Sequence, residues 1–172
     1  HTLFDPRPRS AAIMRDVGAE IGDFRLFHVT ADQIEYLHST DANFPPFREP
    51  ETLERVFAVG DDAFKDSPFG RRFYNQPEYM RLDDIIEGAP EFAERILREL
   101  DAEILYLTGR REIAMTETLA QLKKYNLPGF GSRSKYQDRI SVILRPEGDP
   151  GTVEDFKVRV ISKSAQRGPI AA

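Results

Sequence analysis

Residues 105–110 read Leu-Tyr-Leu-Thr-Gly-Arg, and this stretch decides how the fold is interpreted. It closes an apolar run, residues 102–107, whose length and composition predict a strand buried on both faces. Thr108 and Gly109 then predict a turn, because glycine interrupts regular structure. Residues 111–125 carry apolar side chains at helical spacing and predict a helix. The stretch therefore indicates a strand, a turn and a helix in succession.

The alternation of helix and strand continues on both sides of this stretch. Residues 90–100 predict a helix, and residues 140–144 predict a second buried strand. A capping signal at Thr152 predicts a helix over residues 152–166, and residues 169–172 resemble the start of a third strand. Alternating helices and strands indicate a parallel sheet covered on both faces, in which ligands bind at the carboxyl ends of the strands. The turn after the first strand is therefore the first position to consider for a ligand.

The part of the chain before about residue 88 has a different composition, with many charged residues, prolines and aromatic residues. Apolar residues at helical spacing predict helices here rather than strands. Residues 43–47 predict a loop, because two adjacent prolines remove backbone donors and disfavour helix before them. The predicted helices span residues 10–21, 30–37, 51–64 and 77–86, whereas residues 67–77 show no clear pattern.

Composition limits the classes of function. The chain has 24 Lys and Arg against 29 Asp and Glu, a net charge of −5, and no basic stripe, which argues against nucleic-acid binding. It has no cysteine, which excludes disulfides and thiolate metal sites, and its three histidines lack zinc spacing. No apolar run approaches the ~20 residues of a membrane span, and no signal peptide is visible. We therefore expect a cytoplasmic protein that binds neither nucleic acid nor membrane.

Thr108, Gly109 and Arg110 have the chemistry of an anion site. The Thr108 hydroxyl is a donor at the end of a strand, and the glycine lets backbone N–H groups face a ligand. The helix after this turn adds the partial positive charge of its N-terminus. On these three residues alone, an ordinary strand-to-helix turn is the alternative.

A longer comparison favours the anion site. Residues 105–110, together with Thr116, residues 118–119 and residues 122–128, resemble a stretch of haloacid dehalogenase-superfamily phosphohydrolases. In that family a strand ends in Thr or Ser, Gly-Arg comes next, and the next helix closes on a Leu-Pro turn. The resemblance implies an α/β fold, with a Rossmann-like three-layer α/β/α core, a parallel sheet and a small α-helical cap insertion. It also implies that Thr108 hydrogen-bonds the transferring phosphoryl oxygen.

The start of the chain resembles the end of the family's first motif, Asp-x-Asp-x-Thr. Residues 1–5, His-Thr-Leu-Phe-Asp, resemble the residues just after the second aspartate of that motif, with Thr2 in the Thr position. The resemblance therefore places the nucleophilic and the acid/base aspartates before His1, and we expect these residues alone to be inactive. It also places the fourth motif, which helps to hold Mg²⁺ in the family, beyond Ala172. No metal-binding side chain is predicted within this sequence.

The family's third motif is a cation that neutralises the phosphoryl group. Lys157, near the start of a predicted helix, is the first candidate for this role. Arg145, at the end of a predicted strand, is the alternative. By the same resemblance, Thr2, Gly109, Arg110 and Arg145 are candidates for binding the phosphate of a substrate.

The resemblance also implies a domain organisation and a reaction. Residues 1–6 and 86–172 form the core, incomplete at both ends, and residues 7–85 form a helical cap inserted between the first and second motifs. The implied reaction is Mg²⁺-dependent hydrolysis of a small phosphorylated molecule through an aspartyl-phosphate. Several alternatives stay open: a dehalogenase, although its second motif usually reads Ser-Asn-Gly, a phosphomutase or phosphonatase of the same superfamily, and a non-catalytic ligand-binding module. The identity of the substrate and the oligomeric state are not predicted.

Overall fold

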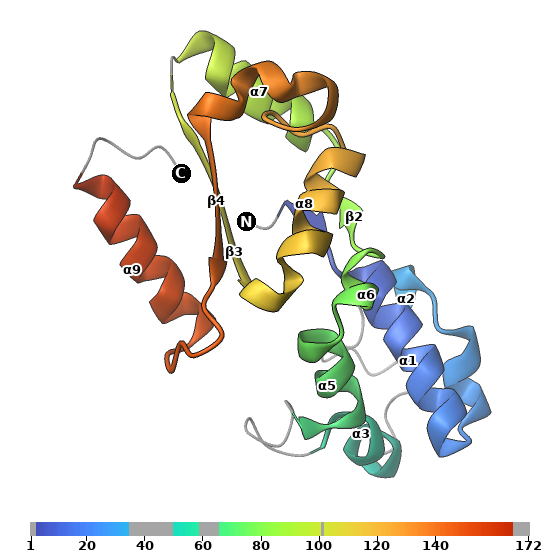
Figure 1. Cartoon of the computed structure of the whole chain (residues 1–172). Coiled ribbons are helices and arrows are strands. Elements are labelled where there is room, and N and C mark those ends of the chain that lie inside the picture. Colours follow the sequence, from blue (N-terminus) through green and yellow to red (C-terminus); the bar gives the residue numbers. More distant parts are fainter. Residues whose placement is uncertain (1–2, 35–49, 59–65, 101, 167–172) are drawn as a thin grey trace. The chain divides into compact units, whose positions relative to one another are not determined.

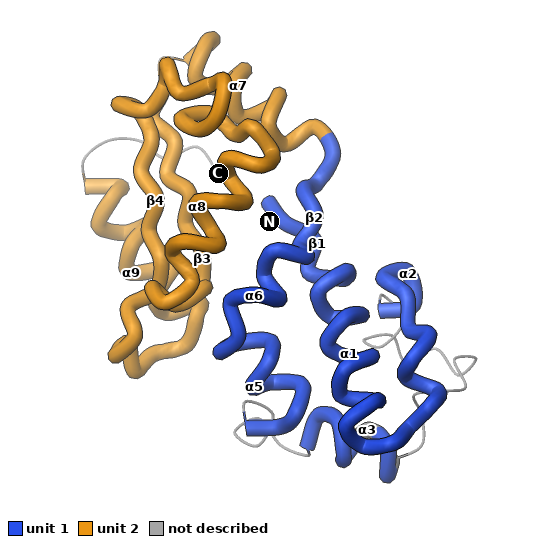
Figure 2. The backbone as a smooth tube through the Cα atoms, turned by 45° about the vertical axis from the view of Figure 1, so that its right-hand side comes forward, with its two compact units in different colours: residues 1–87 blue, residues 88–172 orange. Residues whose placement is uncertain are grey.

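The computed structural model consists of two compact units, His1–Glu87 and Gly88–Ala172 (Figure 2). Both helices and strands occur, so the predicted mixed α/β structure is confirmed. Among the residues that it describes, no helix is both long and apolar enough to cross a lipid bilayer. The described residues are 3–34, 50–58, 66–100 and 102–166.

The first unit is a group of helices bounded by two short strands (Figure 1). The strands pair antiparallel, with Phe4 opposite Ile85. Because the strands pair, the helical segment between them begins and ends at one place. The elements are β1 (Phe4–Asp5), α1 (Arg7–Ile21), η1 (Phe24–His28), α2 (Ala31–Ile34), α3 (Pro50–Phe57), α5 (Pro68–Asn75), α6 (Pro77–Met80) and β2 (Asp84–Ile85).

Helix α1 provides four of the nine buried side chains in the hydrophobic cluster described for this unit, more than any other element. Ile13, Met14 and Val17 are fully buried, and each such side chain contributes roughly 1.5–3 kcal/mol through burial. Gly18 lets η1 approach closely, since a Cβ atom there would lie 2.5 Å from the Cβ atom of Leu26. The other buried side chains of the cluster are Ala11, Leu26, Val29, Ile34, Val56 and Phe69.

A buried carboxylate fixes the start of η1. Asp23 accepts a hydrogen bond from the backbone N–H of Arg25 at 3.1 Å, and the Arg25 guanidinium contacts the same carboxylate at 2.7 Å. The Thr52 hydroxyl donates to Asp23 at 3.4 Å and so links η1 to α3. The side-chain hydrogen bond from Arg25 outweighs burial and lowers the pKa of Asp23 from 3.8 to about 2. The carboxylate is therefore ionised and paired at neutral pH.

A second buried ion pair lies where the helical segment of this unit begins and ends. Arg9, in the first turn of α1, contacts Asp83, the residue before β2, at 2.9 Å, with the two side chains 8% and 3% exposed. The Arg9 guanidinium also lies 3.9 Å from the centre of the Phe73 ring. Since both charges are removed from water, each stabilises the ionised form of the other. The pair ties the beginning of the helical segment to its end.

The structure corrects one helix of this unit and defines another. The helix predicted over residues 77–86 is wrong beyond Met80, because the chain leaves α6 there to pair as β2. Residues 67–77 contain α5. Ser67 caps the N-terminus of this helix, because its side chain accepts a hydrogen bond from the backbone N–H of Gly70 at 2.9 Å. The helices predicted over 10–21 and 30–37 are found as α1 and α2. The helix predicted over 51–64 is found as α3 but ends at Phe57, because Ala58 leaves the helix with a φ of 51°. Residues 35–37 and 59–64, like the loop predicted over 43–47, lie outside the described residues.

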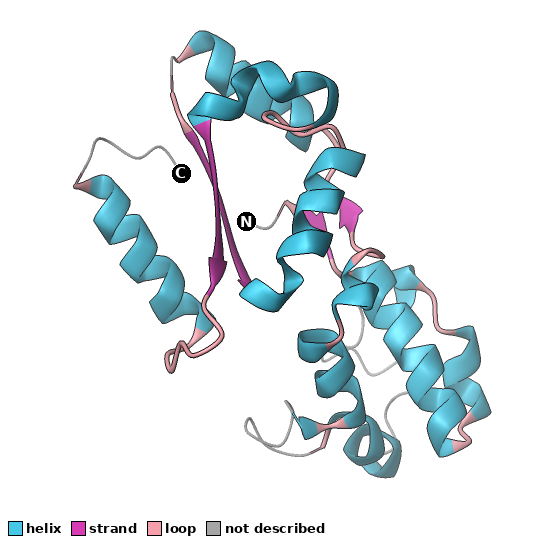
Figure 3. Ribbon diagram, in the orientation of Figure 1, coloured by secondary structure: helices cyan, strands magenta, loops and turns pink. Residues whose placement is uncertain are grey.

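The second unit is a two-stranded parallel sheet with helices on both faces (Figures 1 and 3). Helix α8 lies on one side of the strands and helix α9 on the other (Figure 1). The elements are α7 (Ala89–Glu99), β3 (Ile104–Arg111), η4 (Glu112–Ala114), α8 (Met115–Lys124), η5 (Gly131–Arg139), β4 (Ile140–Arg145) and α9 (Val153–Ala165).

The two strands of this sheet are adjacent and parallel. β3 and β4 are in register from the Ile104–Ile140 pair to the Leu107–Ile143 pair, and an irregularity comes after it. Helix α9 comes after β4 in sequence but packs against β3. In parallel α/β sheets, ligands bind at the carboxyl ends of the strands.

The turn predicted at Thr108 and Gly109 is wrong. Strand β3 continues through both residues to Arg111, because pairing with β4 resumes at the end of the two strands. The helix predicted over residues 111–125 therefore starts later, with η4 and then α8 from Met115.

The expectation that both strands are buried on both faces is also wrong. Tyr106 is the single buried residue of β3 among those described. A sheet of only two strands is narrow, so the helices on its faces do not cover it completely. The helix predicted over 90–100, the strand over 140–144 and the capped helix over 152–166 are confirmed as α7, β4 and α9. Residues 169–172 lie outside the described residues. The complete three-layer core and the boundaries of core and cap stay predictions, since the described strands form one parallel and one antiparallel pair.

Removing one member of the Arg9–Asp83 pair should cost more stability than removing both. Asp83→Ala takes the counter-charge from buried Arg9, and we expect the free energy of unfolding to fall by about 3–5 kcal/mol. In Arg9→Met/Asp83→Leu, apolar side chains replace the pair, so most of this loss should be recovered. Chemical denaturation followed by circular dichroism measures both effects.

The exposed pair of Arg95 with Glu99 in α7 provides the control. Glu99→Ala should leave the unfolding midpoint unchanged, because exposed ion pairs contribute little. A double variant as unstable as Asp83→Ala would contradict the account of the buried pair.

Candidate functional site

The carboxyl end of β3 is the centre of the candidate site. Thr108, Gly109 and Arg110 form it, and all three are half-buried. The backbone N–H of Arg110 donates to the Thr108 hydroxyl oxygen at 3.2 Å. Within the described ranges the Thr108 O–H donates to no acceptor, so this proton is available to a ligand.

The Arg110 side chain contacts α8. Its guanidinium donates to the Gln121 Oε1 atom at 2.6 Å and to the Thr118 hydroxyl at 3.2 Å. Both α8 side chains are buried, with 2% and 3% exposure, and buried polar groups need such partners. Arg110 therefore joins the end of β3 to α8, and its role in phosphate binding stays a prediction.

Arg145, the alternative cation, contacts the loop between β4 and α9. Its buried guanidinium donates to the carbonyl oxygens of Asp149, at 3.0 Å, and Gly151, and lies 3.5 Å from the Asp149 carboxylate. Burial raises the pKa of Asp149, but the hydrogen bonds from Arg159 and the Gly151 N–H outweigh it and lower the pKa. Arg145 thus shapes the loop that leads into α9.

Helix α9 begins with the predicted capping box. The Thr152 hydroxyl accepts a hydrogen bond from the Asp155 N–H at 3.1 Å, and the Asp155 carboxylate accepts one from the Thr152 N–H at 3.0 Å. The backbone hydrogen bond from Thr152, together with that from its hydroxyl, lowers the pKa of Asp155. These bonds fix the first turn of a helix whose N-terminus carries partial positive charge.

Lys157 lies on the side of α9 that faces β3. This side carries Val153, Phe156, Lys157 and Val160, which are half-buried or buried, whereas residues 154, 155, 158 and 159 are exposed. Among the described residues no carboxylate pairs with Lys157. A lysine in this position is suited to binding an anion. The alternative is a structural role, in which the apolar stem packs on the sheet and the ammonium group stays in water.

Gly109 is where α9 meets the end of β3. A Cβ atom at residue 109 would lie 2.4 Å from the Cγ1 atom of Val153, a separation that real Cβ atoms essentially never show. Gly109 thus faces α9, while Arg110 reaches α8 on the opposite face of the sheet. The structure brings the elements that carry Thr108 and Lys157 to one edge, although no hydrogen bond joins these two described side chains.

Sequence reasoning missed two residues that hold the ends of β3 and β4 together. The Arg111 guanidinium donates to the carbonyl oxygens of Pro146, at 3.1 Å, and Glu147. The Glu147 carboxylate in turn accepts the Ile113 N–H at 2.9 Å. These contacts depend on the pairing of the strands, and no sequence pattern marks them. Thr2, the remaining predicted phosphate-binding residue, lies outside the described residues.

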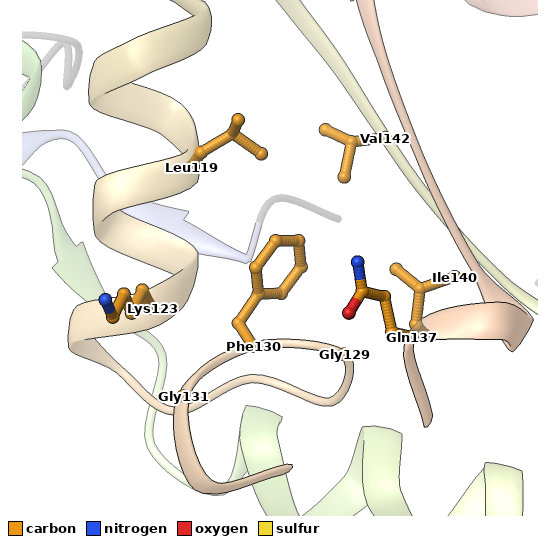
Figure 4. A pocket seen from close by; sticks show the side chains of 8 residues that line it. All are labelled: Leu119, Lys123, Gly129, Phe130, Gly131, Gln137, Ile140 and Val142. Atoms are coloured by element: carbon orange, nitrogen blue, oxygen red, sulfur yellow. The ribbon is translucent and has the colours of Figure 1, made fainter. Parts of the chain in front are cut away.

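A hollow between α8 and β4 is separate from this edge (Figure 4). The Leu119 and Val142 side chains point toward one another across it. It extends to Ile140, at the beginning of β4, so it lies toward the opposite end of the strands from Thr108. Its volume is about 530 Å³, and its walls are mainly apolar: Leu119, Lys123, Gly129, Phe130, Gly131, Gln137, Ile140 and Val142.

Neither a metal cluster nor a known relative identifies the site. In the part of the chain that the structure describes, no group of three or more His, Cys, Asp or Glu side chains is placed to hold a metal ion. No protein-family model matches the chain, and no curated protein or solved structure matches it either. The function is therefore inferred from the geometry of the β3 edge and the sequence resemblance.

Arg110→Met should destabilise the second unit. The substitution takes a charged donor from buried Gln121 and Thr118, and we expect the free energy of unfolding to fall by about 1–3 kcal/mol. Arg110→Met/Gln121→Leu should recover part of this loss, because the buried amide is removed with its donor. Thermal and chemical unfolding measure the change. An unchanged midpoint in Arg110→Met would show that the contact with α8 is unimportant and would favour a ligand-binding role.

Proposed function

We propose that the carboxyl end of β3 binds the phosphoryl group of a small phosphorylated molecule. Thr108 supplies a hydroxyl donor, Lys157 a positive charge, and the first turn of α9 its partial positive charge. The observation that carries the proposal is the contact of Gly109 with Val153, which brings α9 against the end of β3. Thr108 and Lys157 thereby belong to one edge of the sheet although they are distant in sequence.

We further propose that the chain is part of a haloacid dehalogenase-like hydrolase, most simply a Mg²⁺-dependent phosphatase. The order of the residues supports this, with Thr108 near the end of a strand and Lys157 in the helix after the next strand. The parallel pairing of β3 with β4 and the helices on both faces agree with an α/β/α core. In phosphoryl transfer the protein supplies mainly positioning and electrostatic stabilisation, which suits a hydroxyl and an ammonium group.

The described residues do not by themselves form a magnesium site. No cluster of three suitable side chains occurs among them, and Asp149 and Asp155 are engaged by Arg159 and Thr152. We therefore derive no step through a metal ion. Thr108 and Lys157 bind and orient phosphoryl oxygens.

We propose that the helices between β1 and β2 are the cap insertion of such an enzyme. The pairing of the two strands supports this, because an inserted segment must leave and rejoin the chain at one place. The buried Arg9–Asp83 pair fixes the same point. In the family a cap of this kind covers the active site and selects the substrate.

Titration of the 172-residue chain with inorganic phosphate tests the proposed binding. We expect saturable NMR shifts at the Thr108 and Gly109 amides and at the Lys157 side chain, all described by one dissociation constant. Thr108→Ala and Lys157→Met should each weaken binding about tenfold, because each removes a hydrogen bond to a charged group, worth roughly 1.4 kcal/mol.

Lys163→Met is the matched control, since it removes the same charge from an exposed position of the same helix. We expect it to leave the affinity for phosphate unchanged. Equal losses in the Lys157 and Lys163 variants, or shifts that do not saturate, would instead indicate general electrostatic attraction and contradict the proposal.

A further inference from the structure

We infer that Gly109 is a positioning residue: its missing side chain sets how closely α9, and with it Lys157, approaches the end of β3. The inference rests on the proposed function in one respect, the role of Lys157 as the cation for the phosphoryl group. It gives Gly109 a role that differs from presenting its own backbone to phosphate.

The glycine is required by a close approach and not by its backbone conformation. Its φ angle lies outside the left-handed region, so the backbone at this position accepts an alanine. A Cβ atom would, however, lie 2.4 Å from the Cγ1 atom and 3.1 Å from the Cγ2 atom of Val153. The Cβ atom of Val153 is 3.4 Å away, which is ordinary contact. The two Cγ atoms of Val153 are therefore what excludes a side chain at Gly109.

The start of α9 is held from several sides, so Val153 has little freedom to retreat. The preceding Gly151 carbonyl accepts a hydrogen bond from buried Arg145. The capping box of Thr152 and Asp155 closes the first turn. The next buried side chain, Phe156, is 4% exposed. Because packed structure of this kind has little spare volume, a methyl group at residue 109 must displace the first turn of α9 as a whole.

Such a displacement moves Lys157. Val153 and Lys157 are four residues apart, so they lie on one face of α9 about 5.4 Å from each other along its axis. Side chains of a helix tilt toward its N-terminus, and the lysine stem is long and flexible. The stem therefore lets the Lys157 ammonium reach back toward the level of Val153, and the contact at Gly109 sets the distance of its helix from the end of β3.

A set of three variants in the full 172-residue chain tests this inference. Gly109→Ala should weaken inorganic phosphate binding about tenfold, the equivalent of one lost contact of roughly 1.4 kcal/mol. Val153→Ala removes both Cγ atoms and provides the reference affinity for the double variant. In Gly109→Ala/Val153→Ala the new methyl group has room, so the affinity should return to that of Val153→Ala.

Gly148→Ala is the matched control, because nothing lies within 4 Å of a Cβ atom at that glycine, in the loop before α9. It should leave phosphate binding unchanged. The side-chain NMR resonances of Phe156 and Lys157 give a second readout that needs no phosphate. They should shift in Gly109→Ala and return in the double variant.

Resonances that stay unchanged in Gly109→Ala, or a double variant that is no better than Gly109→Ala, would overturn the inference. The two hypotheses fail in different ways. Absence of phosphate binding in the parent chain would remove the proposed function, while the shifts and their rescue by Val153→Ala would still decide whether Gly109 positions α9.

Discussion

The packing of Val153 against Gly109 determines where α9 lies on the sheet of the second unit. A side chain at residue 109 has no room there, so the helix sits closer to the backbone of β3 than any other residue type at this position would allow. The N-terminal turn of α9 is therefore next to the carboxyl end of β3. In the proposed site, the partial charge of that turn and the ammonium of Lys157 both depend on this contact for their position.

Three arginine side chains at the same edge contact protein groups. Arg110 is held by buried groups of α8, Arg111 by carbonyl oxygens after β4, and Arg145 by the loop before α9. Each of them positions backbone or buried polar groups. Within the described part of the chain, Thr108 and Lys157 differ from these arginines, because the hydroxyl proton of one and the ammonium of the other have no protein acceptor. This difference favours Lys157 over Arg145 as the cation for an anionic ligand.

The elements with strong local signals were predictable from sequence. Apolar spacing marked α1, α7 and β4, and the Thr152 capping signal marked the start of α9. The end of β3 was not predictable, because its continuation past Thr108 depends on pairing with β4. The short strand β2 was missed for the same reason, since it exists only through its pairing with β1. The residue types of the candidate site and their order were visible in the sequence. The hydrogen-bond partners of Arg110, Arg111 and Arg145 were not, because they depend on tertiary packing.

The most direct test of the central contact is a disulfide between its two residues. The chain has no cysteine, so Gly109→Cys/Val153→Cys introduces the only two thiols, and the 3.4 Å between their Cβ positions is close to the roughly 3.8 Å of a typical disulfide. Air oxidation followed by thiol labelling and mass spectrometry should show an almost complete cross-link. Gly109→Cys/Val153→Ala/Val158→Cys leaves the same room at residue 109 but places the second cysteine at an exposed position of α9, and it should stay reduced. Two freely labelled thiols in the first variant would contradict the packing of α9 on Gly109 and, with it, the proposed site.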